Sequence, residues 1–224
     1  MTDSLIAIVP AAGVGARAGT PGLPKQYRLL AGQPMLRHAV TALLADARIG
    51  EVRVAVSPDD GWALQALAGL PRTTCRPCGG ATRADTVANA LADSGARDDA
   101  WILVHDAARP GLPREALVRL IDACLADAVG GLLALPVADT VKSGGPRVRA
   151  TLDRDGLWLA QTPQMFRAGM LRAALAAASA GGAVVTDEAS AIEAAGHAPL
   201  LVPGALRNFK VTWPDDFELM EKWL

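Results

Sequence analysis

Short apolar runs alternate along the chain with longer segments in which apolar residues recur every three or four positions. The short runs, at residues 5–9, 51–56, 101–104 and 131–135, predict β-strands. The longer segments, at residues 35–44, 61–67 and 114–125, predict helices. Because strands and helices alternate, we expect an α/β fold, with a Rossmann-like, mostly parallel, doubly wound sheet and crossover helices on both faces.

Residues 137–158 depart from this alternation. They contain two charged half-strands around a turn at residues 143–146, and this pattern predicts a protruding β-hairpin arm. The arm has too few apolar residues to form a core, so it lies on its own domain or reaches a partner subunit. We favour a homodimer, because exchange of such an element is an easy route to dimers.

The C-terminal part returns to the helical pattern. Residues 168–178 and 187–195 predict helices, residues 200–204 and 208–211 predict short strands, and a last helix is expected to begin near Pro214. The chain contains no repeat and no long linker. We therefore expect residues 1–224 to form a single domain that carries the arm.

Composition narrows the classes of function. A chain of 224 residues with 51% hydrophobic residues suits one globular core. The formal net charge of −1 provides no basic field for nucleic acid, and no segment approaches the roughly 20 apolar residues of a membrane span. Cys75 and Cys78 have C-x-x-C spacing, but no second ligand pair for zinc follows. We expect a cytoplasmic protein that binds neither nucleic acid nor membranes.

The first predicted strand is followed by a long glycine-rich loop, "PAAGVGARAGTPGLPK". Residues 13–18 fit the dinucleotide fingerprint G-x-G-x-x-G/A, which raises the possibility of an NAD-linked oxidoreductase. However, prolines at positions 21 and 24 oppose a helix there, and the expected acid after the second strand is missing. Bare amides at residues 11–15, together with Arg17 and Lys25, instead suit a loop that folds over a triphosphate. A solvated surface loop is the structural alternative.

Further polar groups follow other predicted strands. Asp106 leaves the strand at residues 101–104, where a carboxylate can hold Mg²⁺ or a ribose hydroxyl, or simply cap a turn. The glycines at positions 79 and 80 precede Arg83 and Thr86 and would let the backbone approach a base. We interpret His105 as structural. The hydroxyls and the lysine in "QTPQMF", "VTDEASA" and "NFKVTWPDDF" suit a polyol phosphate, although each motif alone could be a helix cap.

The ordered blocks "PAAGVGARAG", "GGATRADTV", "VHDAARP", "LPVADTVK", "LDRDGLWLAQTPQMF", "TDEASAIEAAG" and "NFKVTWPDD" resemble the 2-C-methyl-D-erythritol 4-phosphate cytidylyltransferase family over nearly the whole chain. The resemblance implies a CTP-dependent nucleotidyltransferase that uses Mg²⁺ or another divalent cation. It would transfer CMP to 2-C-methyl-D-erythritol 4-phosphate and release pyrophosphate, a step of non-mevalonate isoprenoid precursor synthesis. A cytidylyltransferase for another polyol phosphate, such as D-ribitol 5-phosphate, is the alternative.

The resemblance also implies roles for individual residues. Arg17, Lys25, Arg154 and Lys210 would be catalytic. The nucleotide would be bound by Pro10, Ala11, Ala12, Gly13, Gly15, Gly80, Thr86, Asp106 and Ala107, and Asp106 is the candidate metal ligand. The second substrate would contact Arg109, Thr162, Thr186 and Lys210 of one subunit and Thr140 and Arg154 on the arm of the other. Ala81 departs from the family, which commonly has an acidic residue there.

Overall fold

The computed structural model describes residues 5–13 and 23–224, so the predicted site residues Gly15 and Arg17 lie outside the described residues. A seven-stranded sheet forms the centre, in the order β11-β7-β10-β6-β1-β4-β5. Its strands are β1 (Leu5–Pro10), β4 (Ile49–Ala55), β5 (Thr73–Arg76), β6 (Trp101–Val104), β7 (Gly130–Pro136), β10 (Trp158–Arg167) and β11 (Leu200–Pro203). The pairs β1–β4, β1–β6, β4–β5 and β7–β11 are parallel, whereas β10 is antiparallel to both neighbours.

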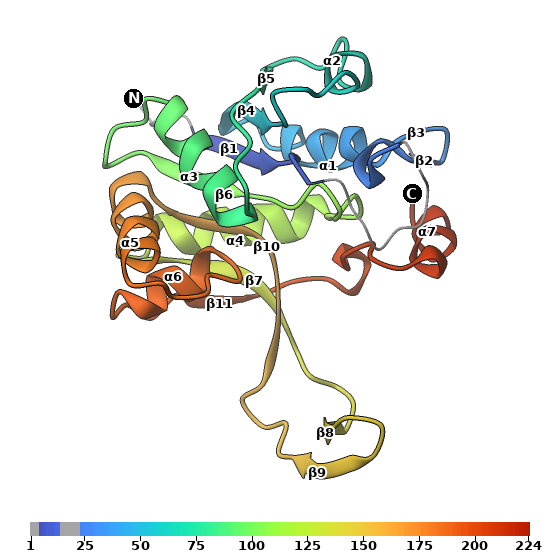
Figure 1. Cartoon of the computed structure of the whole chain (residues 1–224), viewed down its shortest axis with the longest axis vertical. Helices are drawn as coiled ribbons and strands as arrows, with labels where there is room; N and C mark the ends of the chain where they lie inside the picture. The colour runs from blue at the N-terminus through green and yellow to red at the C-terminus, as the bar shows by residue number, and fades with distance from the viewer. Residues whose placement is uncertain (1–4, 14–22) are drawn as a thin grey trace.

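Helices cover both faces of the sheet (Figure 1). They are α1 (Met35–Leu44), α2 (Ala63–Ala66), α3 (Arg83–Asp93), α4 (Arg114–Leu125), α5 (Ala168–Ala180), α6 (Glu188–Ala194) and α7 (Pro214–Glu221), with short 3₁₀ turns η2 (Lys25–Tyr27) and η3 (Leu206–Asn208). The expected mostly parallel, doubly wound α/β sheet is thereby confirmed.

Two apolar layers hold the helices on the sheet because successive strand residues point to opposite faces. Ala7 and Val9 of β1 pack in a cluster with apolar residues of α1 and α4, whereas Ile8 packs with residues of α3, α5 and α6. All three side chains are fully buried. A strand buried on both faces explains why this run is continuously apolar rather than alternating.

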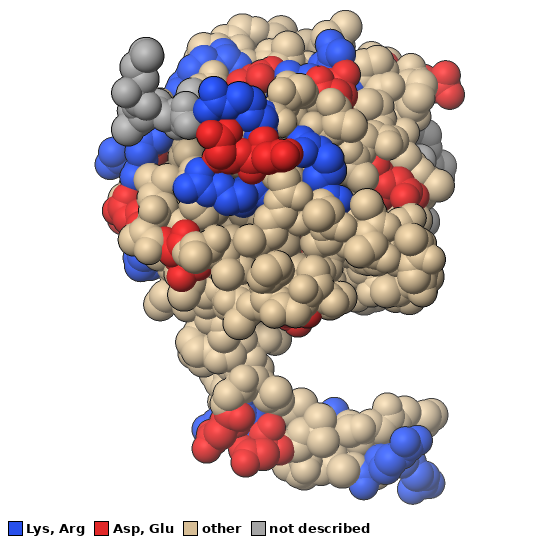
Figure 2. Space-filling view, turned by 90° about the vertical axis from the view of Figure 1, so that its left-hand side faces the viewer, with Lys and Arg blue, Asp and Glu red and all other residues tan. Residues whose placement is uncertain are grey.

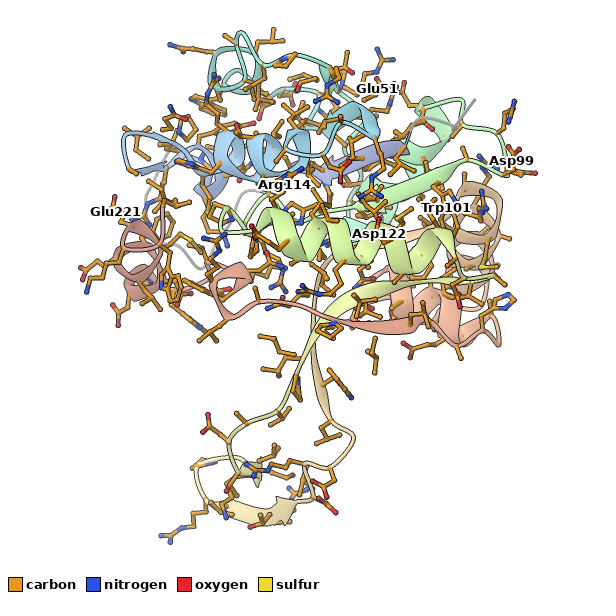
Figure 3. The ribbon with its side chains drawn as sticks, turned by 180° about the vertical axis from the view of Figure 1, so that it is seen from behind. Glu51, Asp99, Trp101, Arg114, Asp122 and Glu221 are labelled. Carbon is orange, nitrogen blue, oxygen red and sulfur yellow. The ribbon has the colours of Figure 1, made fainter. Side chains whose placement is uncertain are left out.

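The outer surface of α4 and the C-terminal helix are tied to the body by polar contacts. In Figure 3, Arg114 and Asp122 lie along α4, and Glu221 lies on α7. Asp122 accepts a hydrogen bond of 2.5 Å from Arg48, and Glu221 accepts one of 3.4 Å from the N–H of Ala31. The second contact joins α7 to the turn between the short strands β2 (Leu29–Leu30) and β3 (Gln33–Pro34). Among the described helices, none has the length and apolar character needed to cross a membrane.

The predicted hairpin arm is present. Strands β8 (Val141–Gly144) and β9 (Val148–Leu152) pair antiparallel with each other in a separate two-stranded sheet, and every residue of β9 is exposed. The arm stands well away from the body on the extended ends of β7 and β10 (Figures 1 and 2). Its assignment as a dimerisation element stays a prediction.

Two parts of the sequence prediction need correction. The expected strand at residues 208–211 does not form, because Val211 leaves the sheet and packs in a small cluster with Phe217 and Met220 of α7. The ten-residue strand β10 was not recognised as one element. The polar residues at positions 161, 162 and 164, with a proline between them, hid its strand pattern.

Candidate active site

The carboxyl ends of β1, β4 and β6 open onto one edge of the sheet, as the parallel pairing requires. A cleft of about 470 Å³ lies there. It is lined by Pro10, Ala11, Ala12, Gly13, Lys25, Gln26, Met35, Gly80, Ala81, Thr82, Arg83, Thr86, Asp106, Ala107, Ala108 and Lys210. Every nucleotide-binding residue predicted from the sequence is therefore in this cleft, except Gly15, which lies outside the described residues.

Close backbone packing on one side of the cleft requires the two glycines at positions 79 and 80. A Cβ atom on Gly79 would lie 2.4 Å from the Cβ of Ala12, and one on Gly80 would lie 2.4 Å from the Cβ of Asp85. Neither distance is tolerated by packed side chains. The turn between β5 and α3 can thus lie directly against the glycine-rich segment after β1.

Thr86 shapes this turn from inside helix α3. Its hydroxyl accepts a 3.0 Å hydrogen bond from the N–H of Gly80 and donates a 2.9 Å bond to the carbonyl of Thr82. Thr82 in turn caps α3 in a reciprocal pair with Asp85. The turn that faces a ligand is therefore fixed by its own helix start.

Lys25 enters the cleft from η2, at the far end of the glycine-rich loop. Its Nζ donates a 2.6 Å hydrogen bond to the carbonyl of Val211. The next residue, Gln26, is buried and donates a 2.8 Å bond to the carbonyl of Ala11. These contacts bring the two ends of the loop together at the cleft, as the sequence interpretation required.

A second, smaller groove of about 260 Å³ adjoins the first. The predicted substrate residues Arg109, Thr162, Thr186 and Lys210 line it, together with Arg83, Asp106, Ala160, Gln161, Gln164 and Asp187. Three residues, Arg83, Asp106 and Lys210, line both the groove and the cleft. Thr140 and Arg154 on the arm are not among the described residues that line either space.

Three cationic side chains surround the carboxylate of Asp106. Its Oδ1 lies 2.9 Å from Nε of Arg83, and its Oδ2 lies 2.8 Å from Nζ of Lys210 and 3.7 Å from Nε of Arg109. Burial alone would raise the pKa of Asp106, but the three cations outweigh it and hold the pKa far below the usual range. Asp106 is therefore ionised throughout the physiological range and fixes Lys210 at the border of the two spaces.

His105 helps to fix Asp106 through a shared contact with Thr162, in the structural role expected from the sequence. Its Nδ1 lies 3.0 Å from Oγ1 of Thr162, and its Nε2 lies 3.1 Å from the carbonyl of Arg109. The Thr162 hydroxyl also accepts a 2.9 Å bond from the N–H of Asp106. Because His105 is fully buried, its pKa falls to about 4, and it is neutral at neutral pH.

The described residues do not form a metal site on their own. They contain no group of three or more His, Cys, Asp or Glu side chains placed to share an ion. Both carboxylate oxygens of Asp106 face cationic side chains. Its predicted role as a metal ligand is consequently a poor fit to this arrangement. Cys75 and Cys78 are free thiols whose pKa values are raised by burial.

Arg83 and Glu188 form an ion pair that the sequence did not predict. Arg83 donates 2.7 Å and 3.1 Å hydrogen bonds to the two carboxylate oxygens of Glu188, 105 residues away, in addition to its bond to Asp106. Burial raises the pKa of Glu188, and Arg83 opposes that shift. The motifs "TRAD" and "TDEAS" showed both side chains, but nothing in the sequence paired them.

The mostly parallel sheet, its antiparallel strand β10 and the lysine-bearing cleft of about 470 Å³ at the strand ends define an α/β nucleotidyltransferase. A profile for 2-C-methyl-D-erythritol 4-phosphate cytidylyltransferase matches residues 5–224. The chain belongs to the 2-C-methyl-D-erythritol 4-phosphate cytidylyltransferase family.

Individual relatives agree with this assignment. The protein of that name from Bordetella petrii is 88% identical over the full length of both chains, and the one from Bordetella pertussis is 80% identical, again over both full lengths. A crystal structure of a 4-diphosphocytidyl-2C-methyl-D-erythritol synthase superposes with a TM-score of 0.88 at 41% identity, covering 100% of this chain and 99% of the other. The Francisella tularensis enzyme superposes with a TM-score of 0.84 at 34% identity, covering 98% and 99%.

Proposed function

We propose that this chain, a single nucleotidyltransferase domain, transfers CMP from CTP to 2-C-methyl-D-erythritol 4-phosphate and releases pyrophosphate. The observation that supports this most directly is the pair of adjoining spaces that share Arg83, Asp106 and Lys210. A bimolecular transfer needs two substrates side by side, with their reacting phosphates at a common boundary. Here that boundary carries fixed cations.

The larger cleft suits the nucleotide. Backbone from Pro10 to Gly13 and the turn at Gly80 offer amides without bulky side chains, and this favours close approach of phosphate and a pyrimidine. Asp106 and Ala107 would contact the ribose. Lys25, and by family resemblance Arg17, would neutralise the charge that grows on the α-phosphate and on the departing pyrophosphate.

The smaller groove suits the polyol phosphate. Its hydroxyls and amides can bond sugar hydroxyls, and Lys210 and Arg109 can hold the phosphate. A phosphate oxygen of this substrate would attack the α-phosphorus in line, forming one P–O bond as the bond to the β-phosphate oxygen breaks. The electron pair of the broken bond leaves with pyrophosphate, and no covalent enzyme intermediate is needed. Thr140 and Arg154 would complete this groove from the arm of a partner subunit.

A divalent cation would have to take most of its oxygen ligands from the CTP phosphates, because Asp106 is the one carboxylate among the described residues that line the nucleotide cleft, and cations already surround it. The nucleotide substrate and the free thiols fit a reducing cytoplasmic compartment.

The test is pyrophosphate release with Mg²⁺, comparing CTP with UTP and ATP, and 2-C-methyl-D-erythritol 4-phosphate with D-ribitol 5-phosphate. We expect release only with CTP and the methylerythritol phosphate, and such a result would also show that Ala81 suffices beside the base. Release with ribitol phosphate alone would keep the nucleotide half of the proposal and replace its second substrate. Membership of the family leaves the NAD-linked alternative without support.

A further inference from the structure

Glu188 is a completely buried carboxylate that is not among the described residues lining either the cleft or the groove. Both of its oxygens are bonded to Arg83. A buried ion pair is a weak source of stability, because removing both charges from water costs about as much as their attraction returns. We therefore ask which groups the Glu188–Arg83 pair holds in position.

The position of Glu188 is itself rigidly fixed. The preceding residue, Asp187, caps α6 by accepting a 2.9 Å bond from the N–H of Ser190. Gln164 on β10 donates a 2.8 Å bond to Asp187 and accepts a 2.7 Å bond from the N–H of Ala189. The residues immediately before and after Glu188 are thus both hydrogen-bonded to Gln164 of the central sheet.

Arg83 links Glu188 to Asp106 in the site, because it is hydrogen-bonded to both carboxylates. Its terminal nitrogens are bonded to Glu188, so its Nε–H is left pointing at Oδ1 of Asp106, 2.9 Å away. The other oxygen of Asp106 holds Lys210. Because Arg83 is also the first residue of α3, directly after the turn beside the nucleotide cleft, a shift of its side chain affects both spaces.

We propose that Glu188 is a positioning residue for the transfer reaction, which acts only through Arg83 to orient Asp106 and Lys210 for both substrates. The inference rests on the proposed function. The planar guanidinium of Arg83 is essential to this arrangement, because it presents two parallel donors to Glu188 and a third donor to Asp106.

The experiment uses the full-length enzyme and compares Glu188→Gln with wild type. The amide keeps the shape of the side chain but loses its charge and one of its two acceptors. We expect kcat/KM to fall about tenfold for CTP and by a similar factor for 2-C-methyl-D-erythritol 4-phosphate. In an Arg83→Gln background, the same substitution should change kcat/KM less than about twofold, because the guanidinium that links Glu188 to Asp106 is already absent.

Asp93→Asn is the matched control. Asp93 lies at the other end of α3 and also accepts bidentate bonds from an arginine, Arg76, but it lies outside the site. This variant should lose stability and keep both KM values and kcat. A Glu188→Gln enzyme that behaves in the same way would show that Glu188 is only structural. An undiminished effect in the Arg83→Gln background would show that Glu188 does not act through Arg83. Either result overturns the proposal.

Arg83→Lys provides a second route if Glu188→Gln does not fold. Lysine keeps the charge but cannot bond Glu188 and Asp106 in the same geometry, so both kcat/KM values should again fall by about tenfold. Unchanged values would overturn the proposal. If wild type releases no pyrophosphate, the proposed function fails, while calorimetric binding of CTP to wild type and variants still measures whether Glu188 orders the nucleotide cleft.

Discussion

Asp106 shows how one carboxylate can organise two adjoining binding spaces, because it lines both the cleft and the groove. It lies at the end of a buried strand, and its position is fixed by His105 and Thr162 below it and by Arg83 beside it. Lys210 is consequently held at the boundary instead of moving freely in solvent. Such preorganisation lowers the barrier, because the cation does not have to be reoriented when charge develops on the phosphates.

His105 gives a prediction at the same scale. Its folded pKa of about 4 lies below its ordinary value of 6.5. The unfolded chain therefore binds a proton between these pH values that the folded chain does not, and the free energy of unfolding decreases as the pH falls from 6.5 towards 4. His105→Gln should reduce this slope by up to about 1.4 kcal/mol per pH unit.

Urea unfolding of wild type and His105→Gln at several pH values between 7 and 4 measures the two slopes. His197→Gln, at an exposed histidine, serves as the control substitution. Equal slopes for wild type and His105→Gln would show that His105 is not held neutral by burial. The comparison uses slopes, so a general loss of stability in the variant does not affect it.

At the scale of elements, η2 is joined to the start of α2 by hydrogen bonds through Asp60. The Tyr27 hydroxyl donates a 2.5 Å bond to Oδ2 of Asp60, whose Oδ1 accepts from the N–H groups of Trp62 and Ala63 at the start of α2. The Tyr27 and Trp62 rings lie 5.7 Å apart. Burial and the Asp60 carboxylate raise the pKa of Tyr27 well above its usual range, so this donor stays protonated.

Tyr27→Phe should lower the free energy of unfolding by about 1–3 kcal/mol, because it removes a hydrogen bond to a charged acceptor. Asp60→Ala should cost more, since it also removes both bonds at the start of α2. Urea denaturation followed by circular dichroism measures both variants. If Tyr27→Phe were as stable as wild type, the contact would not fasten η2.

The central sheet was largely predictable, because its strands are short continuous apolar runs, whereas its helices have apolar residues every three or four positions. Helices α1 and α4 agree with the prediction at both ends, as does β6. The predicted helix at residues 61–67 shrinks to Ala63–Ala66, since Asp60 and the following residues form its cap. Strand β10 was missed because its central residues are polar and carry the site, where function overrides strand periodicity.

The site was predictable wherever a residue follows a strand, because parallel topology brings such residues to one edge. This rule placed Pro10 to Gly13 and Asp106 correctly, and the family resemblance added Arg109, Thr162, Thr186 and Lys210, which do share a groove. It could not pair Arg83 with Glu188, because contact across 105 residues depends on how α3 and α6 lie on the sheet. The pattern of residues in a single sequence does not reveal how α3 and α6 pack on the sheet.

At the scale of the whole molecule, the arm projects from the body and exposes apolar side chains (Figure 1). Leu157 and Leu159 at its base are 40% and 58% exposed, and Leu152 on β9 is 46% exposed. Arg154 donates a hydrogen bond to the carbonyl of Ala138 within the arm and is not among the described residues that line either binding space. Apolar exposure along a projecting hairpin favours burial against a second copy of the chain.

Mixed dimers test whether the arm serves its partner. We expect Lys25→Ala to lower kcat about 100-fold or more and Arg154→Ala to raise the KM for 2-C-methyl-D-erythritol 4-phosphate far more than that for CTP. If each site takes Lys25 from one subunit and Arg154 from the other, an equal mixture restores about one quarter of all sites, because each heterodimer has one intact site. Lys25→Ala mixed with Lys210→Ala is the control, since both residues lie on the body and every heterodimer site keeps one defect. Verified Lys25→Ala/Arg154→Ala heterodimers with no recovered pyrophosphate release would mean that the arm completes the site of its own subunit.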